Sequence, residues 1–148
     1  MIFRMIKSRK TVAIAESCTG GKVCSLLTQR SGSSRYFILG VIAYSNRTKE
    51  VVLKIPNRII ARKGAVSEKV ASLMAQNIRK LAKTDFGIGI TGIAGPTGGT
   101  LQKPVGTVFI ALDCANKRIC KRFCFSGGRI TVRKKAALKS LELLIGIL

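Results

Sequence analysis

The sequence predicts an α/β protein in which helices cover both faces of a mixed β-sheet, forming a single domain over residues 1–148. Three observations lead to this prediction. The 148 residues, of which 47% are apolar, suffice for one buried core. Apolar β-branched runs alternate with amphipathic helical segments along the chain. Glycine-rich loops follow two of the expected strands, where sheets of this kind hold their ligands.

The first half of the chain begins with an expected strand at Thr11–Ala15, an apolar run with β-branched residues. A helix is expected at Lys22–Arg30, followed by a polar turn at Ser31–Ser34. A long strand at Tyr36–Tyr44 and a short helix at Thr48–Leu53 complete this half. Strand and helix therefore alternate twice.

The second half opens with an amphipathic helix that is capped by Ser67 and runs to about Lys83. The segment Gly92–Pro104 is rich in glycine and must be a loop. The remaining expected elements are strands at Phe86–Thr91, Val105–Leu112 and Arg118–Phe125 and a closing helix at Ile130–Leu144. The helical residues expected to face the core are Val23, Leu26, Leu27, Val70, Ala71, Met74, Ile78, Leu81, Val132, Ala136, Leu141 and Leu144.

The charge of the chain is unusual. There are 27 lysines and arginines against 6 acidic residues, for a net charge of +21, and no histidine. A Ser-His-Asp triad, a Cys-His dyad and a histidine-ligated metal site are therefore excluded. The basic residues are scattered and are not interleaved with aromatic ones, so the pattern does not single out nucleic-acid binding. A general basic bias of the surface explains the charge equally well, and anionic small molecules would also be attracted.

The cysteines and the N-terminus indicate the compartment. The five cysteines are odd in number and show no C-x-x-C spacing, which disfavours a disulfide framework or a zinc site and favours a reducing cytosol. No apolar run reaches the roughly 18 residues of a membrane helix. The apolar stretch near the N-terminus is too short for a signal peptide. We therefore expect a cytoplasmic protein without a metal.

The first glycine loop, Ala15–Gly21, lies between an expected strand and an expected helix. Gly20 and Gly21 would let the backbone turn sharply, and the N–H groups at the helix start would face an oxyanion or phosphate. The loop is neither G-x-S-x-G nor a Walker loop. A plain turn in which Ser17 or Thr19 caps the helix fits the pattern equally well.

The second glycine loop, Thr91–Gly99, also follows a strand. Its glycines would line a ligand pocket with backbone donors, or form a mobile surface loop. Tyr44 and Lys49 follow a third strand end. In a chain without histidine they are candidates for proton transfer, although an exposed tyrosine and an exposed helical lysine are the commoner case.

Six ordered blocks extend over most of the chain: AESCTGG, GSSRYFILGVIAYSNRTK, GAVSEKV, TGIAGPTGG, KPVGTV and FSGGR. Together they resemble the C-terminal domain of the CinA family, from about Thr11 to Leu144. The resemblance implies a three-layer α/β/α domain, usually oligomeric, that hydrolyses the carboxamide of nicotinamide mononucleotide without a metal or other cofactor. The products would be nicotinic acid mononucleotide and ammonia.

The resemblance also implies roles for particular residues. Ser17 is similar to the family's nucleophile, and Tyr44 and Lys49 to its proton-handling pair. Arg129 corresponds to the arginine of the family's SGDR stretch. The residues that would bind substrate around these are Cys18, Thr19, Gly20, Gly21, Thr91, Gly92, Gly95 and Arg129.

Two departures from the family stand out. The family's aspartate before Arg129 is Gly128 here, and only about ten residues precede the first strand, where the family carries a full helix. Two functions follow as alternatives. One is a serine amidohydrolase in which a neutral Lys49 takes the proton of Ser17. The other is a catalytically impaired module of the same fold that binds nucleotides or, non-specifically, nucleic acid.

Overall fold

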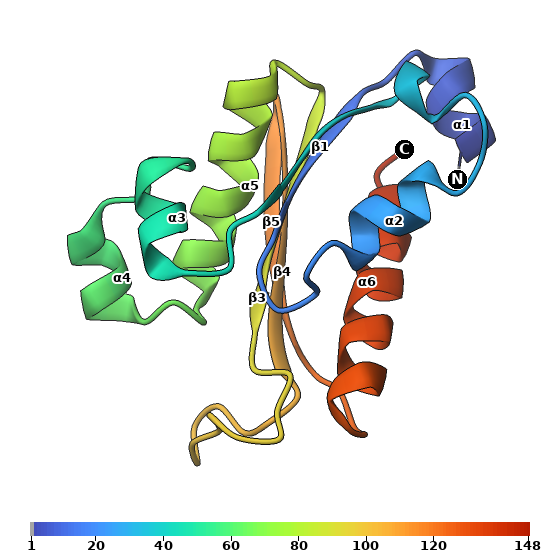
Figure 1. The fold of residues 1–148 in the computed structure, drawn as a ribbon. Coiled ribbons are helices and arrows are strands. Elements are labelled where there is room, and N and C mark those ends of the chain that lie inside the picture. Colours follow the sequence, from blue (N-terminus) through green and yellow to red (C-terminus); the bar gives the residue numbers. More distant parts are fainter. Residues whose placement is uncertain (1) are drawn as a thin grey trace.

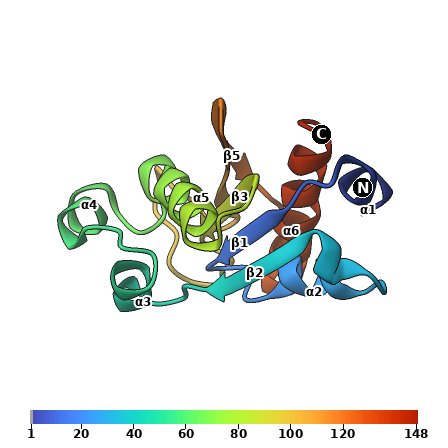
Figure 2. The same ribbon diagram turned by 90° about the horizontal axis from the view of Figure 1, so that it is seen from above.

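The computed structural model describes residues 2–148, which form one mixed sheet between two layers of helices (Figures 1 and 2). The strands are β1 (Val12–Glu16), β2 (Phe37–Ile42), β3 (Phe86–Gly92), β4 (Thr107–Cys114) and β5 (Lys117–Cys124). The helices are α1 (Ile2–Ser8), α2 (Lys22–Thr28), α3 (Asn46–Val51), α4 (Asn57–Lys63), α5 (Glu68–Ala82) and α6 (Arg129–Ile145), with a 3₁₀ turn, η1, at Ser33–Arg35.

The five strands lie in the order β2-β1-β3-β4-β5. β1 pairs in parallel with β2 and β3, whereas β3–β4 and β4–β5 are antiparallel. Figure 2 shows α3, α4 and α5 on one face of this sheet and α1, α2 and α6 on the other. The predicted α/β class and the mixed sheet covered on both faces are confirmed.

Two apolar cores lie on opposite faces of the sheet. The core under α2 and α6 is built around Ile14, Ile88 and Val132, and the core under α5 around Ala13, Val70 and Met74. β3 and α5 are packed so closely that a Cβ atom at Gly87 or Gly89 would lie 2.1 or 2.3 Å from a carbonyl oxygen of α5. Glycine at these positions therefore lets the helix lie directly on the strand.

Most predicted elements are present, with shifted ends. The strand expected at Val105–Leu112 is β4, Thr107–Cys114, because Val105 and Gly106 still belong to the preceding loop. Ser67 caps α5 as predicted, by accepting the N–H of Val70 at 3.3 Å. Leu81, expected in the core, is 55% exposed at the end of that helix.

Two helices were not predicted. α4 follows Pro56 and is only 7 residues long, so its apolar periodicity is too brief to recognise. α1 also has 7 residues, in the segment judged too short for the family's first helix, and Met5 in it is fully buried. No helix within residues 2–148 is long and apolar enough to cross a membrane.

The chain connections create a crevice between β1 and β2. The segment after β1 turns to α2 on one face of the sheet, and the segment after β2 turns to α3 on the other (Figure 1). Adjacent parallel strands whose connections diverge in this way leave a site at their carboxyl ends. Ser17 follows β1 directly, and Tyr44 follows β2 after one residue.

Candidate active site

The carboxyl ends of the three parallel strands are tied together by backbone hydrogen bonds. The N–H of Ser17 donates to the Ile90 oxygen of β3 at 3.0 Å, and the N–H of Ala43 donates to the Glu16 oxygen at 2.7 Å. Ser17 is 8% exposed, so its hydroxyl lies at the wall of the crevice rather than in open solvent. The strands therefore fix the backbone of Ser17.

Lys49 is brought to Ser17 by α3. The Ser45 hydroxyl caps this helix by accepting the N–H of Thr48 at 3.0 Å, and the first turn then directs Lys49 into the crevice. Its side chain is 1% exposed, and its Nζ lies 3.3 Å from the Oγ of Ser17. The alternative of an exposed helical lysine is therefore excluded.

The surroundings of Lys49 favour its neutral form. Burial lowers the pKa of the Lys49 ammonium from its ordinary value, against a smaller opposing effect of Cys18. Nearby positive charge is not among the causes of this lowered pKa. The Nζ also lies 2.8 Å from the Ala43 oxygen and 3.3 Å from the Tyr44 oxygen. A neutral amine can donate its two hydrogens to these carbonyls and present its lone pair to Ser17.

Cys18 is a poor nucleophile in this position. Its side chain is 7% exposed, and burial raises the pKa of the thiol to about 12. The thiolate, which is the reactive form, is therefore scarce at neutral pH. Cys18 lines the crevice, but burial disfavours its reactive thiolate form. Of the two side chains, the Ser17 hydroxyl beside Lys49 is the better candidate for the nucleophile.

The start of α2 is occupied by a carboxylate of the chain itself. Glu16 is fully buried, and its two carboxylate oxygens accept the N–H groups of Gly21 at 2.9 Å and Cys24 at 2.8 Å. Glu16 therefore caps the helix. The plain-turn alternative, in which Ser17 or Thr19 would be the cap, is wrong. The expectation that this helix start would bind a substrate phosphate is not met, because its anion is already in place.

Two backbone donors of the first loop stay available. The N–H of Gly20 donates to the Ser17 oxygen, whereas those of Cys18 and Thr19 donate to no oxygen acceptor within residues 2–148. Arg133 of α6 holds this loop from behind, with its Nε 3.1 Å from the Cys18 oxygen and its Nη2 3.0 Å from the Thr19 oxygen. In a trans peptide the N–H lies opposite the carbonyl, so Arg133 turns the Thr19 N–H away from itself.

Gly20 is required by this arrangement. Its φ of +58° is in the left-handed region, and a Cβ atom there would lie 2.7 Å from the Nη2 of Arg133. Glycine at this position therefore admits the guanidinium. The hydroxyl of Thr19 is buried without a hydrogen-bond partner in the described part of the chain.

Arg129 connects the two sides of the crevice mouth. Its Nη1 donates to the Gly95 oxygen at 2.9 Å, and its Nη2 donates to the Tyr44 hydroxyl at 2.9 Å. Thr91 holds a further part of the wall, since its hydroxyl donates to the Ala65 oxygen at 2.9 Å. At Gly95 the second glycine loop therefore presents its carbonyl oxygen to Arg129, and not an N–H donor to a ligand.

These contacts enclose a cavity of about 210 Å³. The predicted site residues in its lining are Ser17, Cys18, Tyr44, Lys49, Thr91, Gly92 and Arg129. The predicted residues Thr19, Gly20, Gly21 and Gly95 are not part of the lining. Lining residues that the sequence reasoning did not single out are Asn46, Ala65, Val66 and Ala94.

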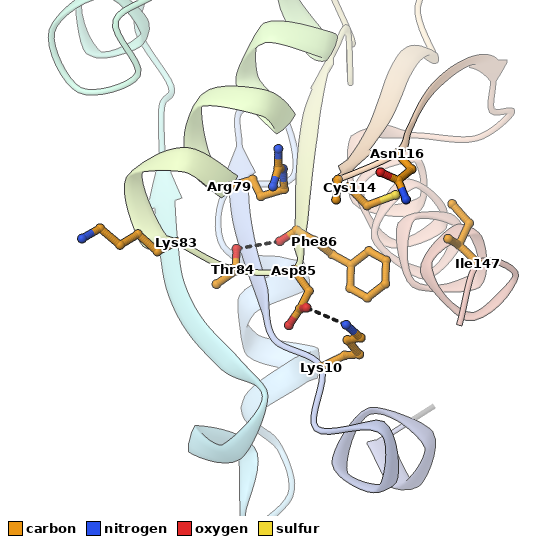
Figure 3. Close-up of a pocket in the computed structure, with 10 residues that line it drawn as sticks. Lys10, Arg79, Lys83, Thr84, Asp85, Phe86, Cys114, Asn116 and Ile147 are labelled. Carbon is orange, nitrogen blue, oxygen red and sulfur yellow. Dashed lines mark hydrogen bonds and ion pairs between the residues drawn. The ribbon is translucent and has the colours of Figure 1, made fainter.

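A larger cavity, of about 450 Å³, lies at the other end of the parallel strands. Figure 3 shows the ion pair of Lys10 with Asp85, which are 2.8 Å apart, and the Phe86 ring beside Ile147. Its Arg79 is likewise paired, with Asp113. Of the three cations in this lining, Lys10 and Arg79 are therefore paired, whereas Lys83 forms no ion pair within residues 2–148. All five cysteines of the chain are free thiols, and residues 2–148 contain no cluster of potential metal ligands.

Comparisons with known proteins identify the family of the chain. The family model described as the CinA C-terminal domain matches residues 1–148. The chain is 50% identical over 143 residues to a CinA-like protein of Syntrophus aciditrophicus, covering 93% of this chain and 34% of that protein. The chain thus spans about a third of the length of the curated relatives it matches.

Solved structures are also similar. A competence/damage inducible protein from Agrobacterium tumefaciens superposes with a TM-score of 0.95 at 33% identity, over 98% of this chain and 89% of that one. A competence-damaged protein (CinA) superfamily protein from Escherichia coli gives a TM-score of 0.94 at 33% identity, over 99% of this chain and 85% of that one.

Proposed function

The chain belongs to the CinA C-terminal domain family, and we propose that it hydrolyses the carboxamide of nicotinamide mononucleotide, releasing nicotinic acid mononucleotide and ammonia. The observation that carries this proposal is the buried Lys49 Nζ at 3.3 Å from the Ser17 Oγ. A serine hydroxyl is a weak nucleophile until a base takes its proton. In a chain without histidine, a lysine whose pKa is lowered by burial is a chemically suitable base.

The proposed reaction has two stages. The Ser17 oxygen attacks the carboxamide carbon while the Lys49 lone pair accepts the hydroxyl proton. The carbon–nitrogen bond then breaks, the departing nitrogen takes that proton, and ammonia leaves an ester on Ser17. Water hydrolyses the ester by the reverse proton route. The sum is one amide and one water converted to one acid and one ammonia.

The developing negative charge on the carboxamide oxygen needs donors. The N–H groups of Cys18 and Thr19 are suited to this, because no backbone oxygen within residues 2–148 accepts them. Arg133, bound to the Cys18 oxygen, fixes the peptide that carries the Thr19 N–H, and the Gly20 N–H on the Ser17 oxygen fixes the peptide that carries the Cys18 N–H. Tyr44 lies in the cavity lining, where its hydroxyl can relay a proton to the leaving nitrogen.

The phosphate of the substrate is assigned to Arg129. Since Glu16 occupies the start of α2, Arg129 is the only cation besides Lys49 in the cavity lining formed by the described residues. Its guanidinium also contacts Tyr44 and Gly95, so phosphate binding would order the mouth of the crevice. The strongly positive chain would favour the approach of an anionic substrate.

A homo-oligomer is part of the same proposal. β2 is the edge strand of the sheet, and it exposes Ile38 at 50% and Ile42 at 52%. Val51 of the nearby α3 is 55% exposed. Apolar side chains along an unpaired strand edge are suited to contact with a second copy of the chain.

The test is release of ammonia from three amides by the purified protein: nicotinamide mononucleotide, nicotinamide riboside and nicotinamide. We expect the mononucleotide to have by far the highest kcat/KM, with the riboside next. Equal rates for the mononucleotide and the riboside would contradict the phosphate assignment. Absence of ammonia from all three, with a correctly folded protein, would favour the alternative of a module that binds nucleotides without hydrolysing them, for which the missing carboxylate at Gly128 is the supporting observation.

A further inference from the structure

Four cations surround a small hollow between α4 and the start of α5. The hollow has a volume of about 290 Å³, and its lining consists of Arg58, Ile59, Arg62, Lys63 and Lys69. We refer to Arg58, Arg62, Lys63 and Lys69 as the α4 cation cluster. None of its members lines the cavity that contains Ser17. The cluster is therefore separate from the proposed catalytic site.

No member of the cluster forms an ion pair within residues 2–148, although Glu68 lies beside Lys69 in the first turn of α5. Within residues 2–148, the acidic partners of the ion pairs are Asp85, Asp113 and Glu142, and each pairs with a cation outside the cluster. Glu16 holds the start of α2, and Glu50 accepts a hydrogen bond from Asn57. The cavity of Figure 3 differs in this respect, since its Lys10 faces Asp85.

The positions of the four cations favour a compact anion. Arg58 and Arg62 are one helical turn apart and therefore lie on the same side of α4, where like charges repel each other. Lys63 ends that helix, and Lys69 lies in the first turn of α5 on the other side of the hollow. A ligand with several negative charges would relieve the repulsion from both sides at once.

We propose that the α4 cation cluster binds a compact multivalent phosphate, such as the triphosphate group of a small molecule. Guanidinium groups bind phosphate oxygens through paired N–H donors, and lysines add point charges. Ile59 is the one apolar residue in the lining of the hollow. A nucleic-acid strand is the less suitable ligand, because it would extend beyond so small a hollow and no aromatic side chain lines it for base stacking.

The site lies next to the wall of the serine cavity. Lys63 is three residues before Val66, which lines that cavity, and three residues span roughly 11 Å at most. Lys103 donates to the Val66 oxygen at 2.7 Å and, near Gly64, extends the positive surface between the two sites. Binding at the cluster is nevertheless measurable without any catalytic activity, so its test does not depend on the proposed function.

The test is calorimetric titration of the full chain with inorganic tripolyphosphate in a magnesium-free buffer. The variant R58Q/R62Q removes two charges of the cluster, and the matched control K117Q/K121Q removes two exposed charges of β5. Both changes lie at exposed side chains, and thermal melts verify that each variant is folded. We expect one tripolyphosphate per chain, bound at least roughly tenfold more weakly by R58Q/R62Q and within about twofold of the original affinity by K117Q/K121Q.

Two results would overturn the proposal. One is an equal loss of affinity in the two double variants, which would mean that the ligand responds to the net charge of the chain and not to the cluster. The other is binding of a single-stranded oligonucleotide of about 15 nucleotides with no measurable binding of tripolyphosphate, which would indicate an extended nucleic-acid surface.

Discussion

The guanidinium of Arg129 donates to the hydroxyl of Tyr44 at 2.9 Å, although the two residues are 85 positions apart in the chain. This contact joins the start of α6 to the segment after β2. Tyr44 is 58% exposed, so little apolar packing fixes its ring. Arg129 therefore has two roles in the proposed site: it offers charge to a phosphate, and it positions a phenol that can move a proton.

Replacement of Arg129 by alanine should affect both roles. We expect KM for nicotinamide mononucleotide to rise roughly tenfold or more, since a charged hydrogen bond to phosphate contributes about 1.5–3 kcal/mol. kcat should also fall, because Tyr44 loses its partner. Y44F provides the comparison, since it should lower kcat and leave KM nearly unchanged. An R129A protein with normal KM for the mononucleotide would show that the phosphate is held elsewhere.

The lowered pKa of Lys49 predicts a pH dependence of both activity and stability. Activity should rise with pH as Lys49 loses its proton, with an apparent pKa below the value of about 10.4 for a free lysine. Between the folded and unfolded pKa values the unfolded chain binds more protons, so the free energy of unfolding should also increase with pH there.

The variant K49M separates the contribution of Lys49 to the pH dependence of stability from the contributions of the other titratable groups. Urea unfolding from about pH 7 to about pH 10 should give a smaller rise of stability with pH in K49M than in the original protein. Equal slopes in the two proteins would mean that Lys49 titrates as an ordinary surface lysine, in contradiction to its burial.

Gly128 is the N-cap of α6 and offers no side-chain acceptor to the helix. A Cβ atom there would meet nothing within 4 Å, and its φ of −71° suits any residue. G128D should therefore stabilise the protein by about 0.5–1 kcal/mol, through a cap and a charge at the positive end of the helix. G128N supplies the cap without the charge and should give the smaller gain. A fall in the free energy of unfolding for both variants would contradict this account of the helix start.

The positive surface predicts that any nucleic-acid binding is non-specific and sensitive to salt. The ion pairs within residues 2–148 engage Lys10, Arg79, Arg118 and Lys139, so most of the 27 basic residues have no acidic partner there. Any binding of DNA or RNA should be independent of sequence and should weaken steeply between about 50 and 200 mM salt. Filter binding with unrelated duplexes measures this. Sequence-selective binding that persists at the higher salt would favour a nucleic-acid module over an enzyme.

Sequence patterns predicted the order of the main elements but not the environment of single side chains. Lys49 and an exposed lysine have the same signature in a short helix, and the burial of Lys49 follows only from the tertiary position of α3, which brings its Nζ to the Ser17 hydroxyl and the Ala43 oxygen. The role of Glu16 as the cap of α2 was likewise not predictable from the sequence. Its carboxylate ends a strand, and its partners, the N–H groups of Gly21 and Cys24, come five and eight residues later.

Arg133 was missed for a different reason. It lies 115 positions from Cys18, whose carbonyl oxygen it binds, and no local pattern connects them. Its position on the same helix as Arg129, four residues later, was the one available signal, because residues at this spacing share a helix face. Long-range contacts of this kind require the sheet order and the packing of α6, which a single sequence does not supply.

The most direct test of the central claim is ammonia release from nicotinamide mononucleotide by four proteins under identical conditions: the original chain, S17A, C18A and K49R. We expect S17A to be inactive and C18A to keep most of its activity, because Ser17 is the proposed nucleophile and burial raises the pKa of the Cys18 thiol to about 12. K49R should fail almost as completely as S17A, since an arginine keeps the charge but cannot accept the proton. Near-normal turnover by K49R, or loss of activity in C18A with retention in S17A, would contradict a serine activated by a neutral lysine.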